Sequence, residues 1–269
     1  VLDEAYDKAL RAGTPPKILL LTHPNNPLGI CYPPEVVQEC IDWCRDNQVH
    51  LISDEIYAGS VYKDGVFTSA LELAGDNLGE YIHFVYALSK DFGLSGLRVG
   101  AVYTENEHIQ LPLQKLNDLC QISSQTQVTV EQMLSTVDDK DEYWTDSFRE
   151  KNCSRIQARC DKLSLCLDEC GIPYLEADSG LFVWMDFSQF LPPLDPARVV
   201  NGKEELSSME ERERILYLDL TTEYGLLFTP GMSMRNERPG FFRGVFTAAS
   251  DDEFELGLKR IRTFVQSTR

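Results

Sequence analysis

Long apolar runs and positive charge are both scarce in this sequence of 269 residues, which begins at Val1. No apolar run approaches the ~20 residues that a membrane-spanning helix needs, and no leader peptide is recognisable. Lysine and arginine number 25 against 43 aspartates and glutamates, giving a formal net charge of −18. Because that field repels polyanions, we expect no nucleic acid and no membrane as partner. Since neither a membrane-spanning run nor a leader peptide is recognisable, the cytoplasm is the expected compartment. An anionic small molecule remains compatible with a local basic pocket.

Cysteine pairs with metal-ligand spacing are absent as well. The eight cysteines include no Cys-x-x-Cys pair, and none of the four histidines stands at ligand spacing from a cysteine. Cys40 and Cys44 are four residues apart on a predicted helix, as are Cys166 and Cys170. This pattern favours reduced thiols on half-buried helix faces over disulfides or zinc ligands, so we expect no metal site.

Three short apolar stretches in the first hundred residues each end in a polar cluster. They cover residues 17–22, 49–53 and 82–88, and continuous apolar runs of this length are typical of strands buried on both faces of a sheet. The polar residues that follow them are Asn26 after the first, Asp54 and Tyr57 after the second, and Lys90 after the third. Ligands of open α/β sheets bind outside the carboxyl ends of strands, so the three ends together predict one site.

Lys90 stands where the third strand is expected to end, before a loop that contains Gly93 and Gly96. An amine held at a strand end in an apolar setting has a lowered pKa, because burial disfavours the ammonium form. Its neutral form is the nucleophile that attacks an aldehyde. Arg98 adds a fixed cation suited to a phosphate. A solvated lysine in a surface loop is the alternative interpretation of these two residues.

The character of the sequence changes after residue 104, where long helical segments replace the alternation of strand and helix. We expect helices at 111–121, 126–137 and 141–170, the last ending at Gly171, and an acidic run near residue 140 as the change of domain. The predicted fold is α/β. Residues 1–138 would form the remainder of a large domain with a mostly parallel mixed sheet and helices on both faces. Residues 139–269 would form a smaller α+β domain with strands at 173–176, 181–187, 224–228 and 241–248.

Five motifs are distributed over nearly the whole sequence. They are residues 25–29 (Asn-Asn-Pro-Leu-Gly), 53–57 (Ser-Asp-Glu-Ile-Tyr), 89–100 (Ser-Lys-Asp-Phe-Gly-Leu-Ser-Gly-Leu-Arg-Val-Gly), 180–182 (Gly-Leu-Phe) and 239–243 (Pro-Gly-Phe-Phe-Arg). They resemble, in the same order, the motifs of the class I/II aminotransferase family of pyridoxal-phosphate enzymes with fold type I, and within it the 1-aminocyclopropane-1-carboxylate (ACC) synthase-like group.

The resemblance implies a cofactor, pyridoxal 5′-phosphate, and a role for each polar residue around its ring. Lys90 would hold the cofactor as an internal aldimine and then act as the base at the substrate Cα. Asp54 would pair with the pyridinium nitrogen. Asn26 and Tyr57 would donate hydrogen bonds to the phenolic oxygen. The structural alternatives are that Asn26 shapes its turn, that Asp54 caps a helical turn and that Tyr57 belongs to the core.

The resemblance also implies two sites for anions. Arg98 would pair with the cofactor phosphate, and Arg243 would bind the substrate α-carboxylate through a bidentate fork that lysine cannot copy. Arg243 could instead form a surface ion pair, and Arg235 is its rival for the carboxylate.

Departures from the family's pattern limit what carries over. We expect the chain to begin inside the pattern, so that a phosphate-binding turn, the aromatic that stacks on the ring and a tyrosine from across the dimer lie outside it. Ala87 stands where many relatives have a phosphate-binding serine, and His23 replaces an asparagine. The polar insertion near 199–208 has no assigned role.

Two functions remain open from the sequence. The leading one is a pyridoxal-phosphate-dependent enzyme, a transaminase or an ACC synthase-like lyase, acting as a homodimer on an amino acid or 2-oxo acid. The sequence does not choose between transamination and elimination, and it does not name the substrate. The alternative is a non-catalytic scaffold or interaction protein with an incomplete cofactor site, which the missing N-terminal motifs and Ala87 favour.

Overall fold

A computed structural model describes residues 1–75, 77–139 and 141–268. Contacts between residues divide the chain into two compact units. Unit 1 comprises Val1–Asn25 and Cys31–Cys153, and unit 2 comprises Asn26–Ile30 together with the chain from Ser154 onward. The division at residue 138 that the acidic run suggested stays a prediction.

Unit 1 contains a four-stranded sheet of order β1-β2-β3-β4, in which the first three strands are parallel and β4 is antiparallel. This agrees with the mostly parallel mixed sheet expected from the three apolar runs. The elements are α1 (Leu2–Arg11), β1 (Ile18–Thr22), α2 (Pro34–Asn47), β2 (His50–Asp54), α3 (Ala70–Ala74), β3 (Ile82–Ala87), α4 (Leu88–Asp91), β4 (Gly100–Thr104), α5 (Glu107–Cys120) and α6 (Ser124–Ser135), with 3-10 turns η1 (Ala58–Ser60) and η2 (Ser95–Leu97).

The core of unit 1 lies between α2, α3 and one face of the sheet. Val37, Ile41 and Cys44 recur at helical spacing along α2 and are fully buried against Leu51 of β2 and Ile82 of β3. Burying each large side chain stabilises the fold by roughly 1.5–3 kcal/mol. This packing fixes where β2 and β3 end, and therefore where the residues that follow them stand.

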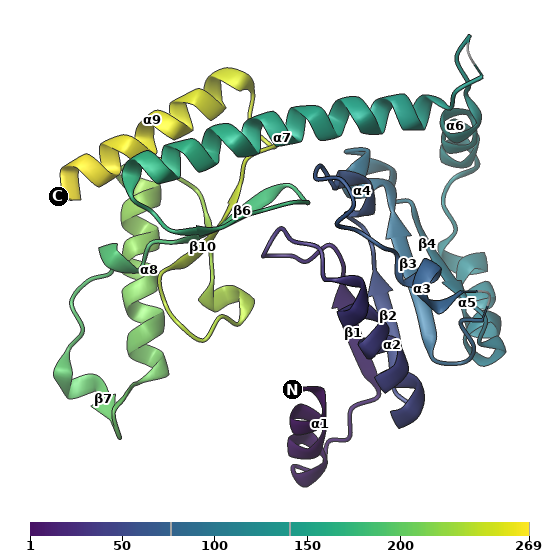
Figure 1. Ribbon diagram of the computed structural model, residues 1–269, viewed down its shortest axis with the longest axis horizontal. Helices are drawn as coiled ribbons and strands as arrows, with labels where there is room; N and C mark the ends of the chain where they lie inside the picture. The colour runs from purple at the N-terminus through teal and green to yellow at the C-terminus, as the bar shows by residue number, and fades with distance from the viewer. Residues whose placement is uncertain (76, 140, 269) are drawn as a thin grey trace. The chain divides into compact units, whose positions relative to one another are not determined.

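Unit 2 is built on an antiparallel sheet of order β5-β6-β10-β9. Its aromatic core includes Phe187, Phe242 and Phe264, all fully buried. Figure 1 shows α9 running beside the C-terminal half of α7. The elements are α7 (Trp144–Cys170, whose first ten residues belong to unit 1), β5 (Tyr174–Leu175), β6 (Phe182–Asp186), η3 (Ser188–Phe190), η4 (Pro196–Arg198), β7 (Val199–Val200), β8 (Lys203–Glu204), α8 (Leu206–Thr222), β9 (Thr229–Pro230), η5 (Met232–Met234), β10 (Phe241–Val245) and α9 (Asp251–Thr268).

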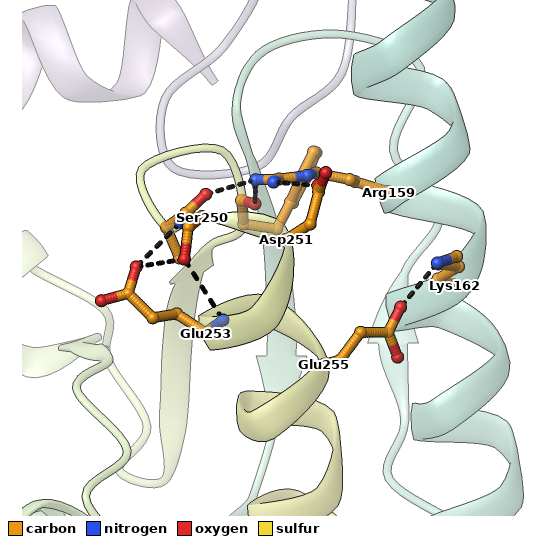
Figure 2. Close-up of polar contacts among 8 residues, drawn as sticks. Arg159, Lys162, Ser250, Asp251, Glu253 and Glu255 are labelled. Carbon is orange, nitrogen blue, oxygen red and sulfur yellow. Dashed lines mark hydrogen bonds and ion pairs between the residues drawn. The ribbon is translucent and has the colours of Figure 1, made fainter.

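Polar contacts attach α9 to α7 (Figure 2). Arg159 of α7 donates to the carbonyl of Ala249 at 2.8 Å and to Asp251 at 2.6 Å. Ser250 and Glu253 form a reciprocal capping box, in which the Ser250 N–H donates to Glu253 Oε2 at 2.9 Å and the Glu253 N–H donates to Ser250 Oγ at 3.3 Å. These bonds satisfy backbone donors that a helix start otherwise leaves unpaired.

The strand expected at residues 224–228 is wrong. This segment instead closes helix α8: Gly225 has a φ of +63°, and the Leu226 N–H bonds back to the Leu220 carbonyl at 2.8 Å. Leu226 is buried but Leu227 is 73% exposed. The apolar run resembled a strand because a helix end that folds back over its last turn also buries apolar residues.

The polar insertion near 199–208 contains the two-stranded β7–β8 hairpin, and Arg198 just before it binds Glu205 at 2.7 Å. Among the described residues, no helix is long and apolar enough to cross a membrane. All eight cysteines are thiols, and burial raises the pKa of Cys44 and Cys166 to about 12.

Candidate functional site

Asp54 is the last residue of β2, at the carboxyl end of the parallel part of the sheet. Its side chain is half-buried and, within the part of the chain that the structure describes, accepts one long hydrogen bond of 3.3 Å, from the Ile56 N–H to Oδ1. Desolvation raises the pKa of Asp54, and the Ile56 bond offsets only part of this shift. A half-buried carboxylate with so little support favours a cationic or N–H-bearing neighbour.

Tyr57 follows three residues later and is only 5% exposed. It precedes η1, and the Ser60 N–H donates to the Tyr57 carbonyl at 2.9 Å. The backbone of this tyrosine is therefore fixed by the turn that it begins.

Lys90 lies on α4, directly after β3, and its side chain is exposed. The apolar setting expected for this amine is therefore not found among the described residues. Helix geometry gives the reason: residues 88 and 91 share a face of the single turn, and Leu88 and Asp91 are the two buried side chains. Lys90 must then point away from the interior of unit 1.

Arg98 closes the loop that follows Lys90. It has a φ of +55°, and its Nη1 donates to the Ser95 carbonyl at 3.1 Å. Ser95 Oγ in turn donates to the carbonyl of Ser89 at 2.9 Å. This folded loop returns the chain from the end of β3 to β4 and leaves the Arg98 side chain exposed.

Arg243 of β10 has the most elaborate environment of the six predicted site residues, and all of it lies in unit 2. Nη1 donates to Asn26 Oδ1 at 2.8 Å, and Nη2 donates to Thr229 Oγ1 at 3.2 Å. The guanidinium carbon lies 5.3 Å from the centre of the Phe182 ring. Nε is buried and has no hydrogen-bond partner among the described residues.

The sheet register explains these contacts. Arg243 pairs with Thr229 of β9, and its side chain shares a face with that of Val245, which pairs with Phe182 of β6. The Asn26 segment is attached to the same unit through Gly29, whose carbonyl accepts the Asp178 N–H at 2.9 Å.

Gly29 cannot carry a side chain. A Cβ there would stand 2.8 Å from the Phe182 carbonyl, and its φ is +72°. The rival of Arg243 has no comparable setting, because Arg235 is an exposed residue at the end of η5.

The structure thus brings the predicted site residues together in two groups. Asp54, Tyr57, Lys90 and Arg98 stand at the ends of β2, β3 and the following loop in unit 1. Asn26 and Arg243 are hydrogen-bonded to each other in unit 2.

Comparison with known proteins identifies the family of this chain. The family described as "Aminotransferase class I and II" matches residues 1–261. The chain belongs to this family. It is 36% identical to 1-aminocyclopropane-1-carboxylate synthase 11 of Arabidopsis thaliana over 269 residues, which are 99% of this chain and 54% of that protein. It is 34% identical to 1-aminocyclopropane-1-carboxylate synthase 1 of Oryza sativa subsp. indica, covering 99% of this chain and 52% of that protein.

Solved aminotransferases share the fold. Aspartate aminotransferase from Thermotoga maritima superposes with a TM-score of 0.73 at 20% identity, covering 99% of this chain and 60% of that one. Aromatic aminotransferase from Pyrococcus horikoshii gives 0.75 at 18% identity, covering 97% and 63%. At such identities the likeness shows the fold, and it confirms the fold class expected from the motifs. The chain spans about half the length of the curated relatives it matches.

Sequence reasoning missed three residues of this aminotransferase-family chain. Thr229 and Phe182 hold the Arg243 guanidinium, and Asp91 is a buried carboxylate beside Lys90. Phe182 lay inside a recognised motif, but its contact depends on strand register. Asp91 also lay inside a recognised motif, but its burial depends on how two turns converge, and Thr229 carried no local signal, because a threonine before proline is an ordinary surface residue.

Proposed function

We propose that this chain belongs to a pyridoxal-phosphate-dependent enzyme that acts on α-amino acids, as a transaminase or an ACC synthase-like lyase. The observation that carries the proposal is the Arg243 guanidinium. Its two Nη atoms are oriented by Asn26 and Thr229, while the buried Nε–H has no partner among the described residues. A buried donor without an acceptor costs about 1–3 kcal/mol. Each Nη atom has a second N–H, from which a substrate carboxylate would accept, and a charged acceptor makes the stronger bond.

The residues present also fit the cofactor. Asp54 is a half-buried carboxylate that accepts one long backbone hydrogen bond, so a protonated ring nitrogen would complete its hydrogen bonding. Because Asn26 Oδ1 accepts from Arg243, its Nδ2 is the atom left to donate to a phenolic oxygen. When bound, pyridoxal phosphate supplies an aldehyde that captures amines and a ring that accepts charge from the substrate Cα.

Each residue then has a defined task. Lys90 presents its amine to the aldehyde and afterwards holds and moves the proton at the substrate Cα. Asp54 keeps the ring nitrogen protonated, and Tyr57 donates to the phenolic oxygen beside Asn26. Arg98 pairs with the phosphate. Arg243 orients the carboxylate and so fixes which Cα bond faces the base.

The substrate would be an amino acid or 2-oxo acid, and we place the enzyme in the cytoplasm as a homodimer by analogy with the family. The second candidate, a non-catalytic scaffold, is favoured by Ala87, which offers no hydroxyl to a phosphate at the start of α4, and by the exposure of Lys90. Transamination and elimination share the same tasks for these residues, so the proposal covers both.

An absorbance titration of the purified chain with pyridoxal phosphate tests the proposal. We expect a visible band that is lost in Lys90→Ala and kept in Lys115→Ala, an exposed lysine of α5. A band that survives in Lys90→Ala would mean that the cofactor reacts with a lysine other than Lys90. Absence of any band in the unaltered chain would favour the scaffold.

A further inference from the structure

The side chain of Asp91 points into unit 1, opposite to that of its neighbour Lys90. It is 4% exposed, and burial raises its pKa while bonds from Ser60, Gly59 and Tyr86 offset part of that shift. Burying a carboxylate is costly unless donors surround it. The groups that donate hydrogen bonds to Asp91 therefore indicate which parts of unit 1 its carboxylate connects.

Three donors from two elements converge on this carboxylate. The Gly59 N–H at 2.6 Å and the Tyr86 hydroxyl at 2.9 Å donate to Oδ2, and the Ser60 hydroxyl donates to Oδ1 at 2.6 Å. Burial and Asp91 itself raise the pKa of Tyr86, so its hydroxyl keeps its proton and remains a donor. Tyr86 lies in β3, directly before the turn that carries Lys90, whereas Gly59 and Ser60 lie in η1.

The carboxylate of Asp91 lies directly against the backbone of η1 at Gly59. A Cβ on Gly59 would stand 2.8 Å from Asp91 Oδ2, so only glycine fits there. The same turn begins at Tyr57, whose carbonyl accepts the Ser60 N–H at 2.9 Å. The carboxylate thus binds the turn that fixes Tyr57.

We propose that Asp91 is a positioning residue of the site: its buried carboxylate joins the turn that carries Lys90 to the turn that begins at Tyr57, and so fixes the amine relative to the phenol. The inference rests on the proposed function, in which these two groups meet the same cofactor. Asp91 acts through its neighbours and touches neither cofactor nor substrate. A catalytic group displaced by about 1 Å loses much of its effect, so this link matters for the reaction as well as for folding.

Two substitutions of Asp91 should weaken the connection between the two turns to different degrees. Asp91→Ala removes all three acceptor contacts, whereas Asp91→Asn keeps one oxygen for Gly59 and Tyr86 and turns an NH₂ toward Ser60 Oγ, which can accept. The first readout is the rate at which pyridoxal phosphate, trapped by borohydride, labels the Lys90 peptide. The second is hydrogen–deuterium exchange of residues 57–61 and 88–97 without cofactor. We expect labelling to fall in the order wild type, Asn, Ala, with about a tenfold loss for Ala, and exchange in both segments to rise in the same order.

Glu213→Gln is the matched control. Glu213 is a buried carboxylate in unit 2 that accepts the Met232 N–H at 2.9 Å and the Gly240 N–H at 2.7 Å. Its loss should lower stability to urea without changing Lys90 labelling or exchange at 57–61, which separates positioning from general destabilisation. If Asp91→Ala does not fold, Asp91→Asn carries the same comparison.

The outcomes separate the two ideas. Selective Lys90 labelling in the wild type that is unchanged in both Asp91 variants overturns the inference and leaves the proposed function standing. Unchanged exchange in both segments also overturns it, whatever the labelling. A wild type in which Lys90 reacts no faster than other lysines overturns the proposed function, and with it the catalytic meaning of Asp91.

Discussion

At the scale of single residues, the neighbours of Arg243 orient its guanidinium. Its guanidinium is oriented by an acceptor 217 residues away in sequence, Asn26, and by the neighbouring-strand Thr229, and it lies over the Phe182 ring. These contacts limit the rotamers of a flexible side chain before any ligand arrives. Less conformational entropy then remains to be lost on binding.

Replacing Arg243 by lysine should weaken substrate binding. Lysine keeps the charge but cannot make two parallel bonds while also bonding Asn26 and Thr229, so we expect the Kd for a 2-oxo acid to rise roughly tenfold to a hundredfold. Titration calorimetry of the cofactor-loaded chain measures this. Arg235→Lys, at the exposed end of η5, is the control and should bind as the wild type does. Equal losses in both variants would contradict the assignment of Arg243.

At the scale of elements, caps and cross-strand contacts decide where the site residues stand. Helix α9 begins at a capping box that also approaches α7, because Arg159 binds both the Ala249 carbonyl and Asp251 (Figure 2). The bonds between α7 and α9 hold these two helices of unit 2 side by side.

Ser250→Ala should cost about 1 kcal/mol of unfolding free energy, since the hydroxyl both accepts from the Glu253 N–H and donates to its carboxylate. Urea unfolding of the chain measures the loss. Thr263→Ala, an exposed residue in the middle of α9, is the control and should change stability by less than about 0.5 kcal/mol. A loss no larger than that of the control would mean that the box does not stabilise α9.

Also at the scale of elements, hydrogen bonds between side chains connect β2, β3 and β4 of the sheet in unit 1. His50 Nδ1 and His83 Nε2 are 2.8 Å apart, and His83 Nδ1 is 2.7 Å from Thr104 Oγ1. Burial, and then the neighbouring His50, lower the pKa of His83 from 6.5. The folded state therefore binds fewer protons at His83 than the unfolded state.

The stability contribution of His83 should be complete above pH 6.5 and should be lost as the pH falls through the lowered pKa. Unfolding free energies measured in urea between about pH 7 and 5 should fall toward acid in the wild type, with a shallower slope in His83→Gln. His108→Gln, exposed on α5, should keep the wild-type slope. Parallel slopes in the wild type and His83→Gln would contradict the role of this histidine.

At the scale of the whole molecule, an acidic composition coexists with cations at three of the predicted site residues. The net charge of −18 disfavours polyanions, yet Lys90, Arg98 and Arg243 are local cations with defined positions. The proposed ligands carry a phosphate and a carboxylate, small anions that local hydrogen bonds can hold against the long-range field. The chain spans about half the length of its curated relatives, so the activity of a whole relative is a proposal for it.

The sequence by itself determined the elements and the order of the motifs. Apolar runs located β1, β2 and β3 to within a residue or two, and Gly171 marked the end of α7, because burial periodicity and capping are local properties. Local pattern failed at residues 224–228, where a folded-back helix end and a strand bury apolar residues alike.

Only the tertiary structure decided which side chains meet. The bond between Asn26 and Arg243 depends on the path of the chain over 217 residues, and the Asp91 carboxylate meets Gly59 because two turns converge. It also decided that Lys90 points outward, because the helical turn buries Leu88 and Asp91 instead. Periodicity determines which face of an element is buried. The partners across that face depend on strand register and loop path, which act between residues far apart in the sequence.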